Sequence, residues 1–403
     1  MKIIEGGVCA AKGFSASGIH CGIRKNKSKK DLSLIYSEEI ANVAAVYTTN
    51  LVKGAPIEVT KKNIADGKAQ AAICNSGNAN TCNADGIEIA EKMCCLVADE
   101  LKIDKNNIVI ASTGVIGQPL NIEPIRNGIP KLVENLGNNS QDAANGIMTT
   151  DTKIKEIAVS FNIDGTECKI GGIAKGSGMI HPDMATMLVF ITTDCAISSK
   201  MLQIALSGDV KDTFNMVSVD GDTSTNDMVT VLANGVAGNK EIVDFGEEFD
   251  TFMKALNTVT VYLCRCIAAD GEGATKMLEC KVDGAKDILT AKKVAKSIIC
   301  SSLTKAAMFG ADANWGRILC AIGYAKCDVD VKCVDVSFKS AKGTIDVCKN
   351  GSGIEFSEEK AKEILLQDEI EILVSLGDGT GSATAWGCDL TYDYVKINGD
   401  YRT

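Results

Sequence analysis

The segment from Lys175 to Leu188, with the sequence KGSGMIHPDMATML, carries the residues of this chain that are best placed to do chemistry. The small residues at 176–178 lead to Ala185 and Thr186, and the strongly β-forming run MLVFITT follows. A threonine that begins a buried strand after a glycine-rich loop can attack its own upstream carbonyl, because glycine allows a strained approach without steric cost. Hydrolysis of the resulting ester would free an α-amine on Thr186.

That α-amine would lie beside the hydroxyl of the same residue. Its reference pKa of about 7.7–8.0 is close to neutral, so one residue could supply both nucleophile and base. This explains how a chain with two histidines, His20 and His181, could perform acyl transfer. On spacing alone an ordinary loop that enters a strand is the more common arrangement, so the rest of the chain has to decide between the two.

Three other motifs resemble sites for a dinucleotide, for calcium or for a phosphate group, but each lacks a feature that such a site requires. Gly377, Gly379 and Gly381 follow one apparent strand and precede another, which predicts a tight hairpin turn and not a dinucleotide site at a helix N-terminus. The acidic run 220–227 begins like a calcium loop but lacks its sixth-position glycine and twelfth-position glutamate. The run 271–276, GEGATK, lacks the first glycine of a phosphate loop. We therefore expect no bound metal and no nucleotide cofactor.

Composition restricts the class of protein. A formal charge of -10 over 403 residues, with one short basic run at 24–30, argues against a nucleic-acid or anionic-membrane surface. Seventeen cysteines without a C-x-x-C pair indicate free thiols in a reducing compartment. The N-terminal stretch has no apolar core before a cleavage site, and no apolar run reaches membrane-spanning length. A cytoplasmic protein that does not span a membrane is expected.

The elements that must position the candidate threonine alternate irregularly. Apolar residues at helical spacing predict helices near 85–102, 198–215, 247–268, 288–301 and 357–366. Runs rich in β-branched residues predict strands at 44–49, 71–74, 107–111, 157–163, 187–192, 228–232, 334–338, 370–376 and 390–397, and Asp164-Gly165 predicts a hairpin. This order favours an α+β fold: a layered αββα-type sandwich with mixed sheets, plus a smaller C-terminal α/β subdomain from about residue 285.

Several long segments in the same order resemble one family, the ornithine acetyltransferases of arginine biosynthesis, whose bifunctional members are also glutamate N-acetyltransferases. The segments are AKGFSASGIHCGI, AAVYTTN, NSGNAN, ASTGVIG, MTTDT, KGSGMIHPDMATML, VDGDTSTND, DGEGATK, GADANWGRI, LGDGTGSATAWGCDLTYDYVKIN and DYRT. They extend over nearly the whole chain. Members of this family resemble amino-terminal nucleophile hydrolases and cleave themselves before the threonine of MATML.

The resemblance implies cleavage between Ala185 and Thr186, into an α fragment of residues 1–185 and a β fragment of residues 186–403. It implies a ping-pong reaction in which Thr186 takes acetyl from N-acetylornithine, releases ornithine and passes acetyl to glutamate. Acetyl-CoA is a second acyl donor in bifunctional members, and no separate motif for it is visible. The family also implies pairs of αβ units, an α2β2 heterotetramer.

Site residues carry over by motif. Thr113 and Gly114 of ASTGVIG match the oxyanion pair of the family, and a hydroxyl with a backbone N–H suits a developing alkoxide. The resemblance assigns substrate contacts to Thr149, Lys175, Thr186, Glu272, Asn398 and Thr403. Lys175 suits a substrate carboxylate and Glu272 a substrate ammonium.

Some questions stay open at this point. Thr150 could replace Thr149 as the substrate contact, and Asp183 stands where the family often has Asn, which could slow cleavage or change its pH dependence. His181 is expected to have a positional role at most. The rival enzyme class is an amino-terminal-threonine hydrolase or aminopeptidase of similar fold, which would pass the acyl group to water, and the non-enzymatic rival is a binding protein that stays intact.

Overall fold

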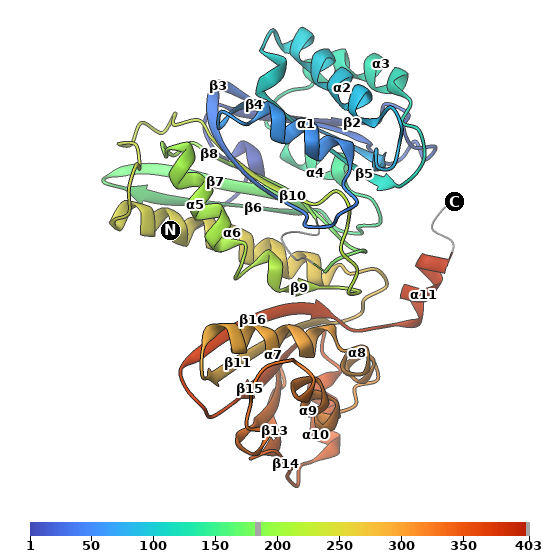
Figure 1. Cartoon of the computed structure of the whole chain (residues 1–403), viewed down its shortest axis with the longest axis vertical. Helices are drawn as coiled ribbons and strands as arrows, with labels where there is room; N and C mark the ends of the chain where they lie inside the picture. The colour runs from blue at the N-terminus through green and yellow to red at the C-terminus, as the bar shows by residue number, and fades with distance from the viewer. Residues whose placement is uncertain (182–186, 400–403) are drawn as a thin grey trace. The chain divides into compact units, whose positions relative to one another are not determined.

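The computed structural model describes residues 1–181 and 187–399 of the chain (Figure 1). The chain divides into two compact units. The first comprises residues 1–176, 183–214 and 223–263, and the second comprises residues 177–182, 215–222 and 264–403. Within the described ranges no helix is both long and apolar enough to cross a membrane.

The first unit contains a nine-stranded mixed sheet with most of its helices on its outer faces. Its strands are β1 Lys2–Ile4, β2 Phe14–Ile19, β3 Leu32–Tyr47, β4 Lys68–Asn78, β5 Ile108–Val115, β6 Lys155–Ile163, β7 Thr166–Lys175, β8 Leu188–Thr193 and β10 Met228–Ala233. Its helices are α1 Ala55–Asn63, α2 Gly86–Leu101, α3 Ile122–Glu134, α4 Ser140–Ile147 and α5 Ser199–Asp209, with the 3₁₀ turns η1 Gly7–Cys9 and η2 Lys105–Asn107. Helix α6 Glu247–Ala269 and the 3₁₀ turn η3 Phe214–Met216 each begin in the first unit and end in the second.

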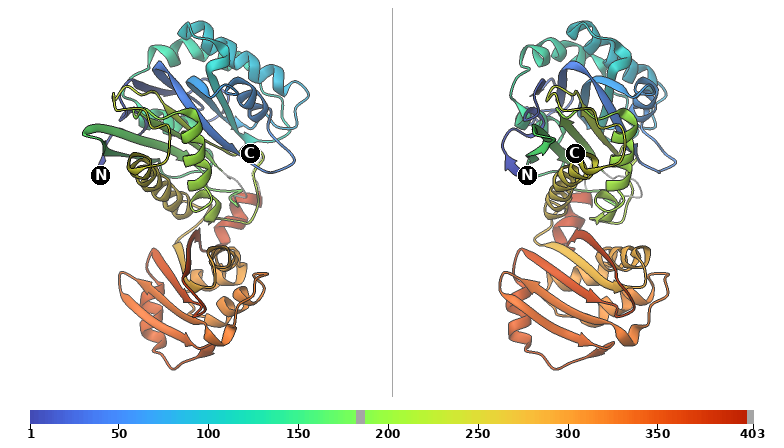
Figure 2. Two further views of the ribbon diagram at one scale, coloured as in Figure 1. Left: turned by 60° about the vertical axis from the view of Figure 1, so that its left-hand side comes forward. Right: turned by 90° about the vertical axis from the view of Figure 1, so that its left-hand side faces the viewer.

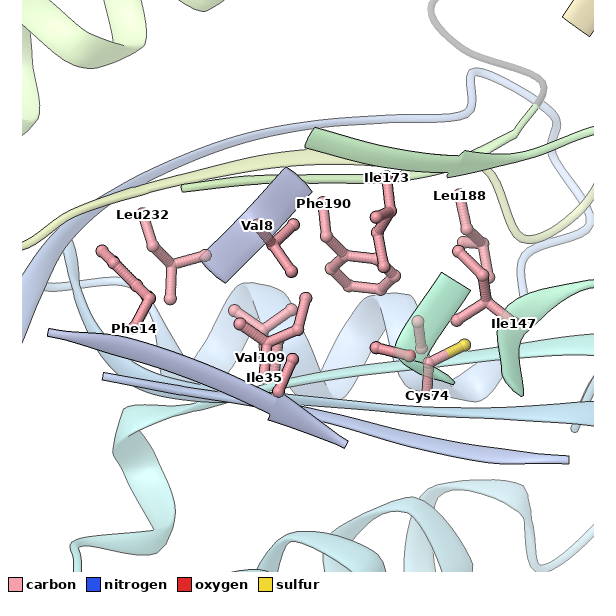
Figure 3. Close-up of a cluster of buried hydrophobic side chains, with 14 of the residues drawn as sticks. Val8, Phe14, Ile35, Cys74, Val109, Ile147, Ile173, Leu188, Phe190 and Leu232 are labelled. Atoms are coloured by element: carbon pink, nitrogen blue, oxygen red, sulfur yellow. The ribbon is translucent and has the colours of Figure 1, made fainter. Parts of the chain in front are cut away.

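This sheet forms two facing layers because the long strand β3 belongs to both. Residues 32–37 of β3 pair with β2, and residues 42–47 pair with β10, in the strand order β1-β6-β7-β8-β10-β3-β4-β5. Figure 3 shows Phe190 and Ile173 of one layer pointing toward Ile35 and Val109 of the other. The apolar side chains between the layers form one buried cluster.

Helices cover the outer face of each layer. A second apolar cluster joins α2 and α3 to the β2–β5 layer, and the three helices α1, α2 and α3 lie on this side in Figure 1. On the other layer, Phe252 of α6 contacts Phe161 of β6 edge to face, at 6.2 Å between ring centroids. The unit is therefore an α/β/β/α sandwich, and the α+β layered fold expected from the sequence is confirmed.

The second unit contains a seven-stranded mixed sheet in the order β14-β13-β12-β15-β11-β16-β9. Its elements are β9 Val217–Ser218, β11 Met277–Ala285, β12 Asp335–Ser340, β13 Gly343–Lys349, β14 Ser352–Gly353, β15 Glu369–Ser375, β16 Gly381–Cys388, α7 Ile288–Cys300, α8 Ser302–Phe309, α9 Trp315–Gly323, η4 Val331–Cys333, α10 Glu358–Leu365 and α11 Tyr392–Gly399. Helix α7 runs along β11 and β16 (Figure 2), and Gly387 lets Ile299 approach the sheet closely.

Two local predictions were wrong. The glycines after β15 do not form a hairpin, because β15 and β16 are separated by β11, which pairs with both. The strand expected over 390–397 is helix α11, and the amide of Tyr394 donates to the Thr391 hydroxyl at 3.4 Å, a helix-capping contact. In contrast, the Asp164-Gly165 hairpin is confirmed: β6 and β7 pair antiparallel, and both turn residues have positive φ.

Candidate active site

The structure describes most of the candidate residues. Thr113, Gly114, Thr149 and Lys175 belong to the first unit, and Glu272 and Asn398 belong to the second. Ala185, Thr186 and Thr403 lie outside the described residues. The residues on either side of the segment 182–186, the cleavage sequence expected from the resemblance, are described, as are the elements that hold them.

Thr113 and Gly114 lie near the end of β5, where this strand runs parallel to β4. Gly114 has φ +129°, and a Cβ at this position would collide with the backbone of Gly77 and Asn78. Position 114 therefore accommodates only glycine, and the absence of a side chain lets the ends of β4 and β5 come into close contact. Thr113 is 9% exposed, so its hydroxyl occupies a largely desolvated position that suits a developing negative charge, and the following Gly114 is half-buried.

Asn226 binds the segment 223–227 to the end of β5 through side-chain hydrogen bonds. Its Nδ2 donates to the carbonyls of Ser112 at 2.9 Å and Ala79 at 2.6 Å, and its Oδ1 accepts from the Thr81 hydroxyl at 2.6 Å. The side chain is buried, with every donor and acceptor used. The segment 223–227 is thereby fixed beside the residue that precedes Thr113.

The first described residues after the cleavage sequence are held in the middle of the sheet. Leu188 pairs with Lys175 of β7 on one side and with Met228 of β10 on the other. The carbonyl of Met187 accepts a hydrogen bond from the amide of Met228 at 2.9 Å, and Met187 is buried. Met187 directly follows Thr186 in the sequence. The backbone at Met187 and Leu188 is held by hydrogen bonds to the neighbouring strands β7 and β10.

Asp151 organises the surroundings of Lys175. Its carboxylate accepts from the amide of Thr149 at 2.9 Å, from the amide of Gly176 at 2.7 Å and from the Lys155 ammonium at 2.7 Å. Burial by itself would raise the pKa of Asp151, but the charges of Lys155 and Lys175 and these hydrogen bonds hold the pKa well below its usual range. Asp151 therefore remains ionised and connects the loop of Thr149 to the start of the glycine-rich segment.

In the second unit, the chain before the cleavage sequence is fixed by Asp220 and Glu272. Asp220 accepts hydrogen bonds from the amides of Met179 and Ile180 at 2.6 and 2.9 Å. The amide of Glu272 donates to the Ser177 carbonyl at 3.0 Å, and Asn398 Nδ2 donates to the Glu272 carboxylate at 2.7 Å. Two candidate residues, Glu272 and Asn398, are thus in direct contact.

His181 is the last described residue before the cleavage sequence. Its Nδ1 lies 3.1 Å from the Ser218 hydroxyl and 3.5 Å from the Cys300 sulfur, all within the second unit. His20 Nδ1 lies 2.9 Å from the Lys29 carbonyl and 3.2 Å from the Asp31 carboxylate. Both histidines thus have partners of their own, and the positional role expected for His181 stays a prediction.

Sequence reasoning missed Asp151, Asp220 and the Asn226–Asp227 pair. The acidic run 220–227 was considered only as a possible calcium loop; Asp220 instead accepts hydrogen bonds from backbone amides, and Asp227 is buried. The described parts of the chain contain no group of three or more His, Cys, Asp or Glu that could hold a metal ion.

Comparison with known proteins gives a match over nearly the full length. The model of the ArgJ family matches residues 15–403. The chain is 51% identical to the arginine biosynthesis bifunctional protein ArgJ of Caldanaerobacter subterraneus subsp. tengcongensis, over 100% of both chains. It is 50% identical to ArgJ 1 of Clostridium acetobutylicum, over 97% of this chain and 96% of the relative.

A solved structure matches as well. The crystal structure of the bifunctional protein ArgJ from Bacillus halodurans is 47% identical with a TM-score of 0.50, and the match covers 52% of this chain and 97% of the solved chain. The solved chain is thus about half as long as the sequence described here.

Proposed function

This chain belongs to the ArgJ family, and on that premise we propose that it transfers acetyl from N-acetylornithine to glutamate through an acetyl-threonine formed on Thr186. It is an acetyltransferase of arginine biosynthesis. The observation that carries the proposal is the match to bifunctional relatives at about half identity, which extends over the entire chain and so over the positions of every candidate residue.

The nucleophile is proposed to arise by cleavage between Ala185 and Thr186. Two features support this. The segment before the cleavage sequence is anchored by Asp220, and the residue after it is held between strands through Met187 and Leu188. The solved Bacillus halodurans chain, matched over 97% of its length, covers only 52% of this chain, as a fragment of a cleaved precursor would.

The proposed reaction has two half-reactions. The Thr186 hydroxyl attacks the acetyl carbonyl of N-acetylornithine, its proton passes to the new α-amine, and the C–N bond breaks as ornithine leaves with that proton. The α-amine of glutamate then attacks the acetyl ester, giving N-acetylglutamate and the free threonine hydroxyl. In both steps Thr113 and the amide of Gly114 stabilise the oxyanion.

Substrate recognition is proposed for Thr149, Lys175, Glu272, Asn398 and Thr403. Lys175 and Glu272 are both largely buried charges, 8% and 7% exposed, and buried charges are retained where they meet an opposite charge. Asp151 already forms an ion pair with Lys155, so the substrate carboxylate is proposed as a further partner of Lys175, and the substrate ammonium as the partner of Glu272.

Ornithine release with and without glutamate tests the proposal against the hydrolase alternative. Purified protein given N-acetylornithine should release ornithine only when glutamate is present, beyond a first turnover. Steady release without glutamate would instead indicate an amino-terminal-threonine hydrolase.

Two further experiments test the finer parts of the proposal. An assay with acetyl-CoA and glutamate as the only substrates tests whether acetyl-CoA is a second acyl donor. The native mass of the protein tests the proposed α2β2 assembly.

The oxyanion role of Thr113 gives a specific prediction. Thr113→Val keeps the shape of the side chain and removes the hydroxyl, and it should lower kcat by about 10²–10³-fold. Thr113→Ser, which keeps the hydroxyl, should retain most of the rate. Steady-state kinetics of both variants measure this, and equal rates for Val and Ser would remove Thr113 from the oxyanion site.

A further inference from the structure

Two cysteines lie on opposite sides of the proposed cut in sequence, and the sheet of the first unit brings them together. Cys168 belongs to β7, and Cys195 is the second residue after β8. Both are buried free thiols, and neither has a part in the reaction proposed above. In the sequence they are two of seventeen cysteines, and only the fold shows that they lie together.

Strand register places the two cysteines opposite each other. The ladder of β7 and β8 is antiparallel. One hydrogen bond beyond its last pair, from the amide of Asp194 to the carbonyl of Lys169 at 3.2 Å, continues the ladder past the end of β8. The next pair in this register is one residue further along each strand. Cys168 therefore faces Cys195.

The type of pair determines how close the two side chains are. Asp194 and Lys169 form a hydrogen-bonded pair, since the amide of Lys169 in turn donates to the Asp194 carboxylate at 2.7 Å. The neighbouring pair, Cys168 with Cys195, is then a non-hydrogen-bonded one, with a Cα separation of about 4.5 Å and both side chains on one face. A disulfide requires Cα atoms about 4.4–6.8 Å apart, and a pair in this register meets that requirement.

Asn239 joins the two cysteine positions through its buried side chain. Its Oδ1 accepts from the Cys168 thiol at 3.6 Å and from the amide of Ala196 at 2.7 Å, and its Nδ2 donates to the carbonyl of Ala196 at 3.1 Å. Ala196 directly follows Cys195. A hydrogen bond between the two thiols, together with burial, raises the pKa of Cys195 well above its usual value. The thiols are therefore in contact.

Cys280 shows the environment of a solitary buried cysteine. It lies in β11, is as deeply buried as the pair, and has its pKa raised by burial alone. Its cross-strand neighbours are Ile372 and Ala385. Cys168 and Cys195 differ from Cys280 in having a second thiol beside the first.

We propose that Cys168 and Cys195 form a reversible disulfide when the protein meets hydrogen peroxide. The thiolate of one cysteine attacks a peroxide oxygen, the O–O bond breaks, and a sulfenic acid forms while the released hydroxide takes up the thiol proton to give water. The second thiol attacks the sulfenic sulfur, the S–O bond breaks, and a second water leaves with the remaining thiol proton. Two thiols thus lose two electrons, and one hydrogen peroxide is reduced to two water molecules.

The position of the pair favours slow and reversible oxidation. Buried thiols react slowly, and local opening at the end of a sheet is what exposes them. Cys168 is three residues from the hairpin turn at Gly165, and β8 ends two residues before Cys195. Opposed Cβ atoms in a sheet lie ~4.5–5.5 Å apart, farther than the ~3.5–4.5 Å of a disulfide, so the bond forms under compression and is readily reduced.

The disulfide would cross the proposed cut. Cys168 belongs to the fragment of residues 1–185 and Cys195 to the fragment of residues 186–403, so oxidation would join the two products covalently. This consequence rests on the self-cleavage proposed above. The bond itself does not, because the uncut chain contains both cysteines.

Peptide mapping of the oxidised protein tests the bond in cut and uncut chains alike. The purified protein is treated with hydrogen peroxide, its free thiols are alkylated during unfolding, and trypsin is added. Trypsin places Cys168 in peptide 156–169 and Cys195 in the peptide that ends at Lys200, each without another cysteine. We expect these two peptides to be linked to each other and to separate after treatment with dithiothreitol. Cys280 should be recovered in its alkylated form.

The same digest reports on self-cleavage. The peptide of Cys195 comprises residues 176–200 in an uncut chain and residues 186–200 in a cut one. A failure of the cleavage proposal therefore changes the length of this peptide, whereas a failure of the disulfide proposal changes its linkage. For cut protein, a denaturing gel without reductant should show one full-length species after oxidation, and two fragments once reductant is added.

Serine variants provide the matched controls. Cys168→Ser and Cys195→Ser should each lose the linked peptide completely, whereas Cys280→Ser should form it as the unaltered chain does. The map of the unaltered chain decides the question even where a serine variant fails to fold. The inference is overturned if Cys168 and Cys195 are recovered alkylated at a peroxide concentration that oxidises the exposed Cys82 and Cys320, or if either is linked to a third cysteine.

Discussion

Thr186→Ala should yield a single full-length polypeptide with no measurable acetyl transfer. The variant removes the only atom proposed to attack the Ala185 carbonyl, and it removes the acetyl acceptor of the reaction as well. Both losses should therefore appear together. Intact-mass spectrometry measures the first, and glutamate-dependent ornithine release measures the second.

Thr186→Ser is the matched control because it keeps a hydroxyl on the same backbone position. It should still cleave and should retain part of the acetyltransferase activity. Cleavage that persists in Thr186→Ala would place the nucleophile elsewhere, whereas full activity in an uncut polypeptide would show that the α-amine of Thr186 is not needed.

Asp151→Asn should lower the free energy of unfolding by about 3–5 kcal/mol, since it removes one partner of a buried ion pair. The side chains of Lys155 and Asp151 are 1% and 0% exposed, and the same carboxylate accepts from the amides of Thr149 and Gly176. Equilibrium denaturation in urea measures the change. Glu88→Gln is the control: its pair with Lys92 lies on the surface of α2, so its loss should have little effect.

The same ion pair gives a pH dependence of stability with a definite sign. The pKa of Asp151 is lower in the folded chain than in the unfolded chain, because Lys155 and Lys175 outweigh the effect of burial. Its contribution to stability is therefore complete above the unfolded aspartate pKa of about 3.9 and is lost as pH falls toward the lower folded value. Asp151→Asn should remove this part of the acid sensitivity, and an unchanged acid-unfolding curve would argue against it.

The regular elements were predictable where a single pattern dominates. Helices α2, α6 and α7 have long apolar stripes, and their predicted bounds agree closely with the observed ones. Helix α3 was not predicted, since Gly128 and Pro130 interrupt its pattern; Gly128 allows close contact with Cys21. The sequence of helix α11 predicts a strand because tyrosine and valine favour strands. The hydrogen bond from the amide of Tyr394 to the Thr391 hydroxyl stabilises the helix instead.

The candidate site was predictable only in part. Thr113, Lys175 and Glu272 came from motif resemblance; their burial could not be seen in the sequence, since Lys and Glu are usually exposed. Asp151 and Asp227 were missed because a carboxylate that faces the interior looks the same in sequence as one that faces water. What distinguishes Asp151 is its contact with Lys155 and with the amide of Gly176, and what distinguishes Asp227 is its place beside the ladder that joins β10 to β8, segments some forty residues apart.

The strand order of the first unit has a consequence for the proposed cut. Strands β7 and β3 precede Thr186, β8 and β10 follow it, and the order β7-β8-β10-β3 places the later pair between the earlier ones. The two products are thus interleaved through shared ladders and cannot be pulled apart without dismantling the sheet. Once unfolded, however, they are two separate molecules whose reunion depends on concentration, so maturation would convert a reversible fold into one preserved mainly by slow unfolding.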